Sequence, residues 1–187
     1  MATPPAWAKG VAADLPTFLS DHAFCEQQAA QMALSLAGQY AMDFELVEKV
    51  TTLASEEILH FRRVLSILRR RGIRPVRRRV NPWMAAMRAA IAPRPAELAK
   101  VDRLLCAALV EARSCERFGC AAKAIDDAEI EALLAELGPA EDRHWRLFHD
   151  LAARELPAPD FEVRWLTWLE HEAKVSSRFG RGATVHG

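Results

Sequence analysis

Two Glu-x-x-His motifs are the residues in this sequence most suited to chemistry, and both fall in stretches with helical periodicity. Residues three apart lie on one face of a helix, so the carboxylate and imidazole of each motif can reach the same metal ion. A partner glutamate stands about thirty residues upstream of each motif. Four glutamates and two histidines from four helices form the set with which some helical bundles hold a pair of metal ions. The candidate catalytic and metal-binding residues are Glu26, Glu57, His60, Glu111, Glu141 and His144.

A solvated surface pair is the usual explanation of a single Glu-x-x-His motif, because glutamate is common and a spacing of three is easily met by chance. Here each of the four glutamates falls on the apolar stripe of its helix, where an unpaired charge would be costly. Two motifs with matched upstream glutamates therefore favour a metal centre in the core. Carboxylate and imidazole ligands suit iron or manganese, and no cysteine is placed to favour zinc.

Two further residues, Glu116 and His22, are alternative or additional candidates for the metal site. Glu116 competes with Glu111 for the third-helix position, but the stripe that carries Glu116 faces sideways from the core, so Glu111 is preferred. His22 lies one turn before Glu26 on the same helix face. It either supports that glutamate or packs in the core, and core packing is the commoner role of a histidine on an apolar face.

The elements that must position these residues are helices. Apolar residues recur at spacings of three and four through four long segments, joined in the order hairpin, long crossover, hairpin. That order predicts an all-α, ferritin-like four-helix bundle with one long crossover and extra short helices. A single domain is expected over residues 1–175, with a flexible C-terminal tail at 176–187. The long helices are expected at 18–39, 44–70, 96–125 and 128–154, with shorter helices at 82–91 and 160–175.

Length and composition agree with one helix-rich globular domain. The chain has 187 residues, about half of them apolar, and only eight glycines. It has no apolar run of eighteen residues, so no transmembrane helix is expected, and its first residues lack the pattern of a secretory signal. The four cysteines show no Cys-x-x-Cys spacing and are expected to be free thiols in a cytoplasmic protein.

The net charge of zero hides an uneven distribution. Residues 62–79 contain nine arginines and no acidic residue. Such a run either provides solubility and contacts to acidic parts of the same chain, or neutralises the phosphates of a nucleic acid. The arginines considered for nucleic-acid binding are Arg69, Arg70, Arg71, Arg74, Arg77, Arg78 and Arg79.

Two strings around the candidate ligands resemble one enzyme family. ASEEILHF at 54–61 and EARSCERF at 111–118, together with the motif at 141–144, are similar to the tRNA 2-methylthio-isopentenyladenosine hydroxylases. The resemblance covers roughly residues 15–175, all six candidate ligands match it, and the second string is far more specific than the general di-iron pattern. It implies a non-haem di-iron monooxygenase that uses O2 to hydroxylate the isopentenyl side chain of a hypermodified adenosine next to the anticodon.

The resemblance implies two iron ions as the cofactor, O2 as co-substrate and the anticodon stem-loop of tRNA as a partner. It also makes tRNA the preferred partner of the arginine run. No flavin or nicotinamide fingerprint is present, so electrons are expected from a separate reductase. The expected roles are bridging for Glu57 and Glu141, terminal ligation for Glu26 and Glu111, and ligation of one iron each for His60 and His144.

Three alternatives share part of this pattern. A ferritin-like ferroxidase or iron-storage protein would use the same ligands, but storage gives no reason for the arginine run. A di-iron oxygenase of a small molecule or lipid is the second alternative, and a non-catalytic, basic RNA-binding bundle is the third. The fold does not choose among them, because such bundles host many activities. The sequence leaves open the oligomeric state, the reductase and the stereochemistry.

Overall fold

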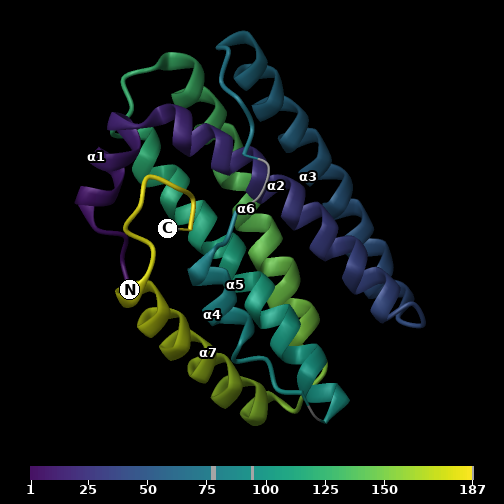
Figure 1. Ribbon diagram of the computed structural model, residues 1–187. Helices are drawn as coiled ribbons and strands as arrows, with labels where there is room; N and C mark the ends of the chain where they lie inside the picture. Colours follow the sequence, from purple (N-terminus) through teal and green to yellow (C-terminus); the bar gives the residue numbers. More distant parts are fainter. Residues whose placement is uncertain (77–78, 94, 187) are drawn as a thin grey trace. The chain divides into compact units, whose positions relative to one another are not determined.

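The computed structural model describes residues 1–76, 79–93 and 95–186. Within these residues all regular secondary structure is helical (Figure 1), and none of the helices is long and apolar enough to cross a membrane. The helices are α1 (Pro5–Ala13), α2 (Leu15–Gln39), α3 (Phe44–Arg70), α4 (Pro82–Arg88), α5 (Ala96–Ala122), α6 (Ala128–Ala153) and α7 (Ala158–Arg178).

Contacts group the described residues into two compact units, and the single domain over residues 1–175 stays a prediction. The first, which we call the α2–α3 unit, comprises residues 13–79 and 183–185. The second, the α5–α6 unit, comprises residues 1–12, 80–182 and 186 and holds most of the remaining helices. Each unit contains one of the two predicted long hairpins, and each is described by itself below.

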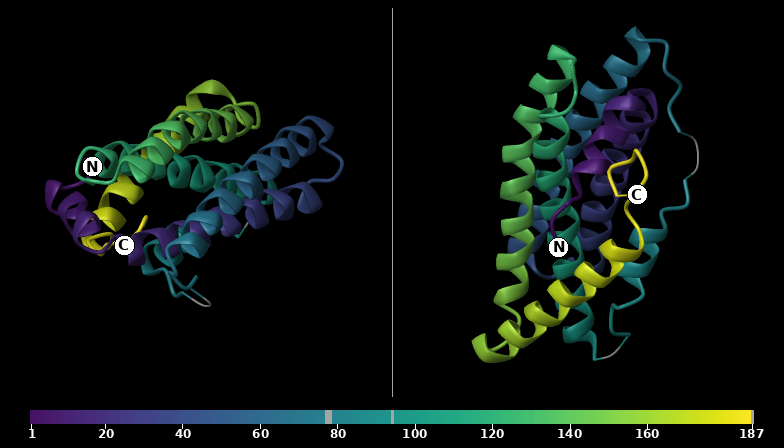
Figure 2. Two further views of the ribbon diagram at one scale, coloured as in Figure 1. Left: turned by 90° about the horizontal axis from the view of Figure 1, so that it is seen from above. Right: turned by 90° about the vertical axis from the view of Figure 1, so that its left-hand side faces the viewer.

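In the α2–α3 unit, two long helices pack side by side as an antiparallel hairpin (Figures 1 and 2). Aspartates begin both helices: Asp14 accepts a hydrogen bond from the Thr17 amide at 3.2 Å, and Asp43 accepts one from the Leu46 amide at 3.1 Å. After α3, Gly72 has a φ of 67°, a left-handed conformation that glycine adopts without strain. These local signals explain why the predicted and observed ends of α3 coincide.

In the α5–α6 unit, the second hairpin pairs α5 with α6. Helix α7 packs against both hairpin helices and against α4, and α4 also packs against α5. Asp127 begins α6 by accepting a hydrogen bond from the Ile130 amide at 3.3 Å. Asp102, on α5, is fully buried and binds Arg164 and the Trp168 indole of α7. These buried contacts explain why the helix predicted at 160–175 packs against the hairpin.

The C-terminal segment differs from the flexible tail expected at 176–187. Residues 176–178 complete α7, and the chain then folds back as a short loop, seen in the right-hand view of Figure 2. Val185 and His186 are buried. The amide of Val185 donates to Asp21 at 2.7 Å, and the His186 ring stacks on Trp83 with centroids 4.8 Å apart. Tertiary contacts therefore order a segment that has no periodicity of its own.

Candidate metal centre

Three of the predicted ligands meet in the α2–α3 unit, and we call them the α2–α3 triad. Glu26 comes from α2, whereas Glu57 and His60 come from neighbouring turns of α3. The Nδ1 atom of His60 lies 3.5 Å from Oε2 of Glu26 and 3.7 Å from Oε2 of Glu57. One ligand atom from each residue lies within 4.8 Å of the others. These distances allow one metal ion to contact all three side chains.

The helical period explains why the charged side chains of this triad are buried. On α3, Leu53 lies one turn before Glu57, and Val64 lies one turn after His60. Both apolar residues are buried, and so are the carboxylates of Glu26 and Glu57. A carboxylate in such surroundings requires a nearby positive charge. A histidine proton or a metal ion can provide that charge.

His22 supplies a further contact to this triad. Its ring is fully buried and packs against Phe18, and its Nε2 atom lies 2.5 Å from Oε1 of Glu26. The sequence favoured core packing over support of Glu26. The structure shows both at once, because the residue four positions before a ligand shares its helix face. His22 therefore orients the Glu26 carboxylate from within the core.

The α2–α3 triad has strongly shifted acid–base properties. Burial by itself would raise the pKa of Glu26, but the hydrogen bond and charge of His22, followed by hydrogen bonds with His60 and Glu57, lower it to about 2. Burial likewise opposes a charged His60, yet hydrogen bonds to Glu26 and Glu57 raise its pKa to about 10. The metal-free triad thus holds a proton on His60 at neutral pH. A metal ion would take the place of that proton.

The other three predicted ligands lie in the α5–α6 unit, and we refer to them together as the α5–α6 triad. Glu111 is on α5, and Glu141 and His144 are on neighbouring turns of α6. All three are buried. The Nδ1 atom of His144 lies 3.8 Å from Oε2 of Glu141, close to the 3.7 Å between the matching atoms of His60 and Glu57. The two Glu-x-x-His motifs therefore present their ligand atoms in nearly the same way.

Glu116, the competitor of Glu111, is engaged elsewhere in the α5–α6 unit. Its carboxylate accepts hydrogen bonds from the amide and hydroxyl of Thr3, at 2.7 and 2.9 Å, and pairs with Arg113. Its side chain is 34% exposed, whereas Glu111 is buried. This placement supports Glu111 as the ligand on α5, an assignment that remains a prediction.

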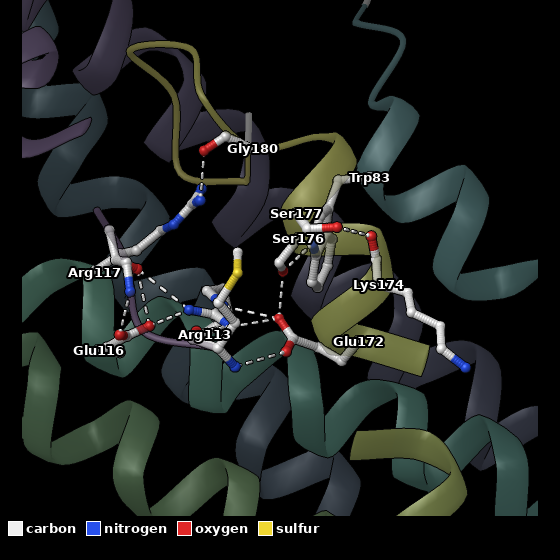
Figure 3. A network of polar contacts seen from close by, with 11 residues as sticks. Trp83, Arg113, Glu116, Arg117, Glu172, Lys174, Ser176, Ser177 and Gly180 are labelled. Carbon is white, nitrogen blue, oxygen red and sulfur yellow. Dashed lines mark hydrogen bonds and ion pairs between the residues drawn. The ribbon is translucent and has the colours of Figure 1, made fainter. Parts of the chain in front are cut away.

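The string EARSCERF at 111–118 does more than supply one candidate ligand (Figure 3). Arg113 donates to Glu172 of α7 and to the carbonyl of Met1, and Arg117 donates to the carbonyl of Gly180 at 2.7 Å. The Arg117 guanidinium also lies over the ring of Trp7, 4.8 Å from its centroid. The residues just after Glu111 therefore fasten both ends of the chain to α5. No local pattern predicts these partners, because they lie far from Arg113 and Arg117 along the chain.

The donor set of the triads fits iron or manganese. The candidate ligand atoms are carboxylate oxygens and imidazole nitrogens, which these metals accept. Burial and then the neighbouring carboxylates Asp142 and Glu141 raise the pKa of Cys115, which disfavours the thiolate form of this side chain. The buried Oε2 atom of Glu141 accepts no hydrogen bond from the described residues and remains available to a cation.

The arginine run divides into outward and inward members. Arg69, Arg70, Arg71 and Arg74 are exposed. Arg79 is instead half-buried, pairs with the buried Asp21 and donates to the hydroxyl of Thr184 at 2.9 Å. Arg77 and Arg78 lie outside the described residues. Of the seven arginines considered for nucleic-acid binding, Arg79 thus pairs with a buried carboxylate of its own unit.

Comparison with known families gives a match along almost the entire chain. The family model described as tRNA-(MS[2]IO[6]A)-hydroxylase (MiaE) matches residues 1–186. A tRNA 2-(methylsulfanyl)-N(6)-isopentenyladenosine(37) hydroxylase of Pseudomonas putida is 37% identical over 80% of this chain and 72% of its own. The enzyme of the same name from Salmonella typhimurium is 26% identical over 92% of this chain and 81% of its own.

Among solved structures, the chain is similar to a Synechococcus protein described as having aldehyde deformylating oxygenase activity. The two share 27% sequence identity and a TM-score of 0.92, over 100% of this chain and 94% of that one. This similarity and the helical structure confirm the all-α, ferritin-like fold predicted from the sequence.

Proposed function

Because the chain belongs to the tRNA-(MS[2]IO[6]A)-hydroxylase (MiaE) family, we propose that it hydroxylates the isopentenyl side chain of 2-methylthio-isopentenyladenosine in tRNA, next to the anticodon. The match over residues 1–186 carries this proposal. The buried glutamates and histidines of the two triads support it, because the reaction needs a centre that can activate O2. The family favours this reaction over iron storage or oxidation of a small molecule, and the substrate places the reaction in the cytoplasm.

The two triads would together hold two iron ions. In this proposal Glu57 and Glu141 would hold the irons as bridging ligands, Glu26 and Glu111 would be terminal ligands, and His60 and His144 would each bind one iron. The matched residue types, the burial and the similar spacing within the two motifs support this arrangement. Iron bound there would supply the chemistry that reduces O2 and inserts one oxygen atom into an allylic C–H bond.

The remaining tasks belong to the protein's own side chains. His22 keeps Glu26 ionised and oriented, and His60 releases its proton when metal binds. Burial of the carboxylates keeps bulk water from the reacting atoms. The balanced reaction consumes O2, two electrons and two protons and yields the alcohol and one water. A separate reductase supplies the electrons, and exposed arginines of the 62–79 run bind tRNA phosphates.

The proposed function is tested by supplying the protein with iron, a reductant, O2 and isopentenylated tRNA. Mass spectrometry of the released nucleosides should show a gain of one oxygen atom on 2-methylthio-isopentenyladenosine. A matched reaction with Glu57→Ala should give no such product. Iron-loaded protein that leaves this nucleoside unchanged while oxidising a small molecule would contradict the proposal, and so would assembly into a storage cage.

A further inference from the structure

The outer face of α3 places an apolar pair directly outside the α2–α3 triad. Glu57 is buried and the side chain of His60 is only 11% exposed, whereas the two residues between them, Ile58 and Leu59, are 45% and 56% exposed. Exposed aliphatic side chains within a metal-binding motif have no role in packing the hairpin. They mark a surface that lies one helix thickness from the proposed ligands.

Arginines continue this face toward the end of α3. Arg62 and Arg69 follow Ile58 at four and eleven positions, so all three lie on the same side of the helix. The two arginines are separated by two turns, about 10 Å at ~1.5 Å per residue. Both are exposed, and neither side chain has an ion-pair partner among the described residues, which is also true of Arg74. These cations are therefore available to an anionic partner.

Arg79 has the opposite environment although it belongs to the same run. Its guanidinium pairs with Asp21, which is 2% exposed and also accepts the amide of Val185 at 2.7 Å. Nearer the start of the segment, the hydroxyl of Ser20 donates to the backbone carbonyl of Arg74 at 3.1 Å. Both ends of the stretch from Arg74 to Arg79 are thus fastened to α2. The sequence alone does not distinguish Arg79 from the exposed arginines of the same run.

We propose that the outer face of α3 is the RNA-binding surface, and that Arg79 is a positioning residue that does not contact RNA. In this arrangement Arg62 and Arg69 bind phosphates of one RNA strand, and Ile58 and Leu59 contact the ribose or base of a neighbouring nucleotide. RNA is the partner that combines regularly spaced negative charges with apolar base and sugar surfaces. The inference rests on the proposed function and names the surface that serves it.

The salt dependence of tRNA binding tests this division of the arginines. Each lost phosphate contact should reduce the slope of log affinity against log salt by about 0.7–0.9. We expect Arg62→Gln with Arg69→Gln to lower the slope by about 1.5 and to leave the iron content unchanged. Arg146→Gln, an exposed arginine of α6 that pairs with Asp142, is the matched control and should leave the slope unchanged. An unchanged slope in the double variant would overturn the proposal.

Two further variants separate the roles of the remaining residues. Asp21→Asn with Arg79→Gln removes both charges of the buried pair, so neither is left without a partner. It should weaken tRNA binding without changing the salt slope, and a lower slope in this variant would show that Arg79 binds phosphate. Ile58→Ser with Leu59→Ser should weaken binding several-fold at an unchanged slope. Unchanged affinity for tRNA would show that Ile58 and Leu59 are not part of the RNA-binding surface.

Failure of this inference is distinguishable from failure of the proposed function. If wild-type protein adds no oxygen to isopentenylated tRNA, the proposed function is wrong whatever the binding data show. If wild-type protein hydroxylates the tRNA but the α3 variants bind it like wild type at every salt concentration, only the surface is misassigned.

Discussion

The two triads use the same residue types at nearly the same spacing but are supported in different ways. In the α2–α3 triad, a histidine one turn before the terminal glutamate contacts it, His22 against Glu26 at 2.5 Å. The matching position before Glu111 is Ala107, which offers no polar atom in its side chain. A hydrogen bond from a histidine on the same helix therefore orients Glu26, whereas no histidine occupies the matching position for Glu111.

The helices that carry the ligands also differ in how much of their surface is buried. Sixteen of the 27 residues of α5 are buried, against eight of the 27 residues of α3. Buried ion pairs and both chain ends surround α5 just after Glu111 (Figure 3), whereas α3 exposes its outer face beside Glu57 and His60. The comparison indicates that α5 is held by many tertiary contacts within its unit, whereas α3 leaves one face exposed.

The largest expected effect tests whether the two triads serve one centre. Glu57→Ala and Glu141→Ala each remove one proposed bridging carboxylate. If both residues bridge a shared pair of irons, either change should remove both metals and abolish hydroxylation. Iron analysis of the purified variants measures this directly. Loss of half the iron in each variant would mean that the triads bind metal independently, and full iron with full activity would refute both assignments.

The second-largest effect is expected from breaking the buried ion pair that holds α5 against α7. Arg113→Met leaves the buried carboxylate of Glu172 without its guanidinium, and breaking a buried pair in this way costs about 3–5 kcal/mol. Urea denaturation should show this loss in the free energy of unfolding. Arg146→Gln, which breaks an exposed pair with Asp142, should change nothing measurable. Adding Glu172→Gln to Arg113→Met should restore part of the free energy of unfolding. An unchanged free energy of unfolding in Arg113→Met would show that this ion pair does not stabilise α5.

A smaller effect is expected at His22, which only the α2–α3 triad possesses. His22→Ala removes the hydrogen bond that orients Glu26, and loss of such a contact lowers metal affinity about 10–100-fold. Competition with a chelator measures the affinity for each variant. His171→Ala, which removes a histidine bound to the carbonyl of Ala86, is the control and should retain wild-type affinity. Equal affinities in the two variants would mean that His22 serves packing alone.

The long helices could be predicted from the sequence because their signals are local. The expected range 44–70 matches α3, and the expected starts at 96 and 128 match α5 and α6. Aspartates cap α3 and α6, a proline precedes α5, and these signals act together with apolar periodicity within a few residues. Helix α1 and the buried C-terminal segment escaped prediction. Their order depends on partners more than sixty residues away, such as Arg117 for Gly180 and Asp21 for Val185.

The candidate site was predictable to a similar extent. The spacing of Glu57 and His60 places them together because both lie on one helix face, and Glu26 joins them because a hairpin aligns its two helices. The pattern could not separate a supporting His22 from a packed one, nor an inward Arg79 from its outward neighbours. Each of those distinctions depends on a partner in another element, which periodicity does not reveal.

The smallest expected effect concerns the charge of the metal-free α2–α3 triad. The pKa of His60 is raised from 6.5 to about 10, so its protonated form stabilises the fold fully below pH 6.5, and this contribution is lost as the pH rises toward 10. The pKa of Glu26 is lowered from 4.5 to about 2, so its contribution is present above pH 4.5 and is lost as the pH falls toward 2. Urea denaturation of metal-free protein should therefore show the greatest stability between pH 4.5 and 6.5. His60→Gln should flatten the alkaline decline, whereas the same decline in this variant would show that the charge lost at high pH lies outside the triad.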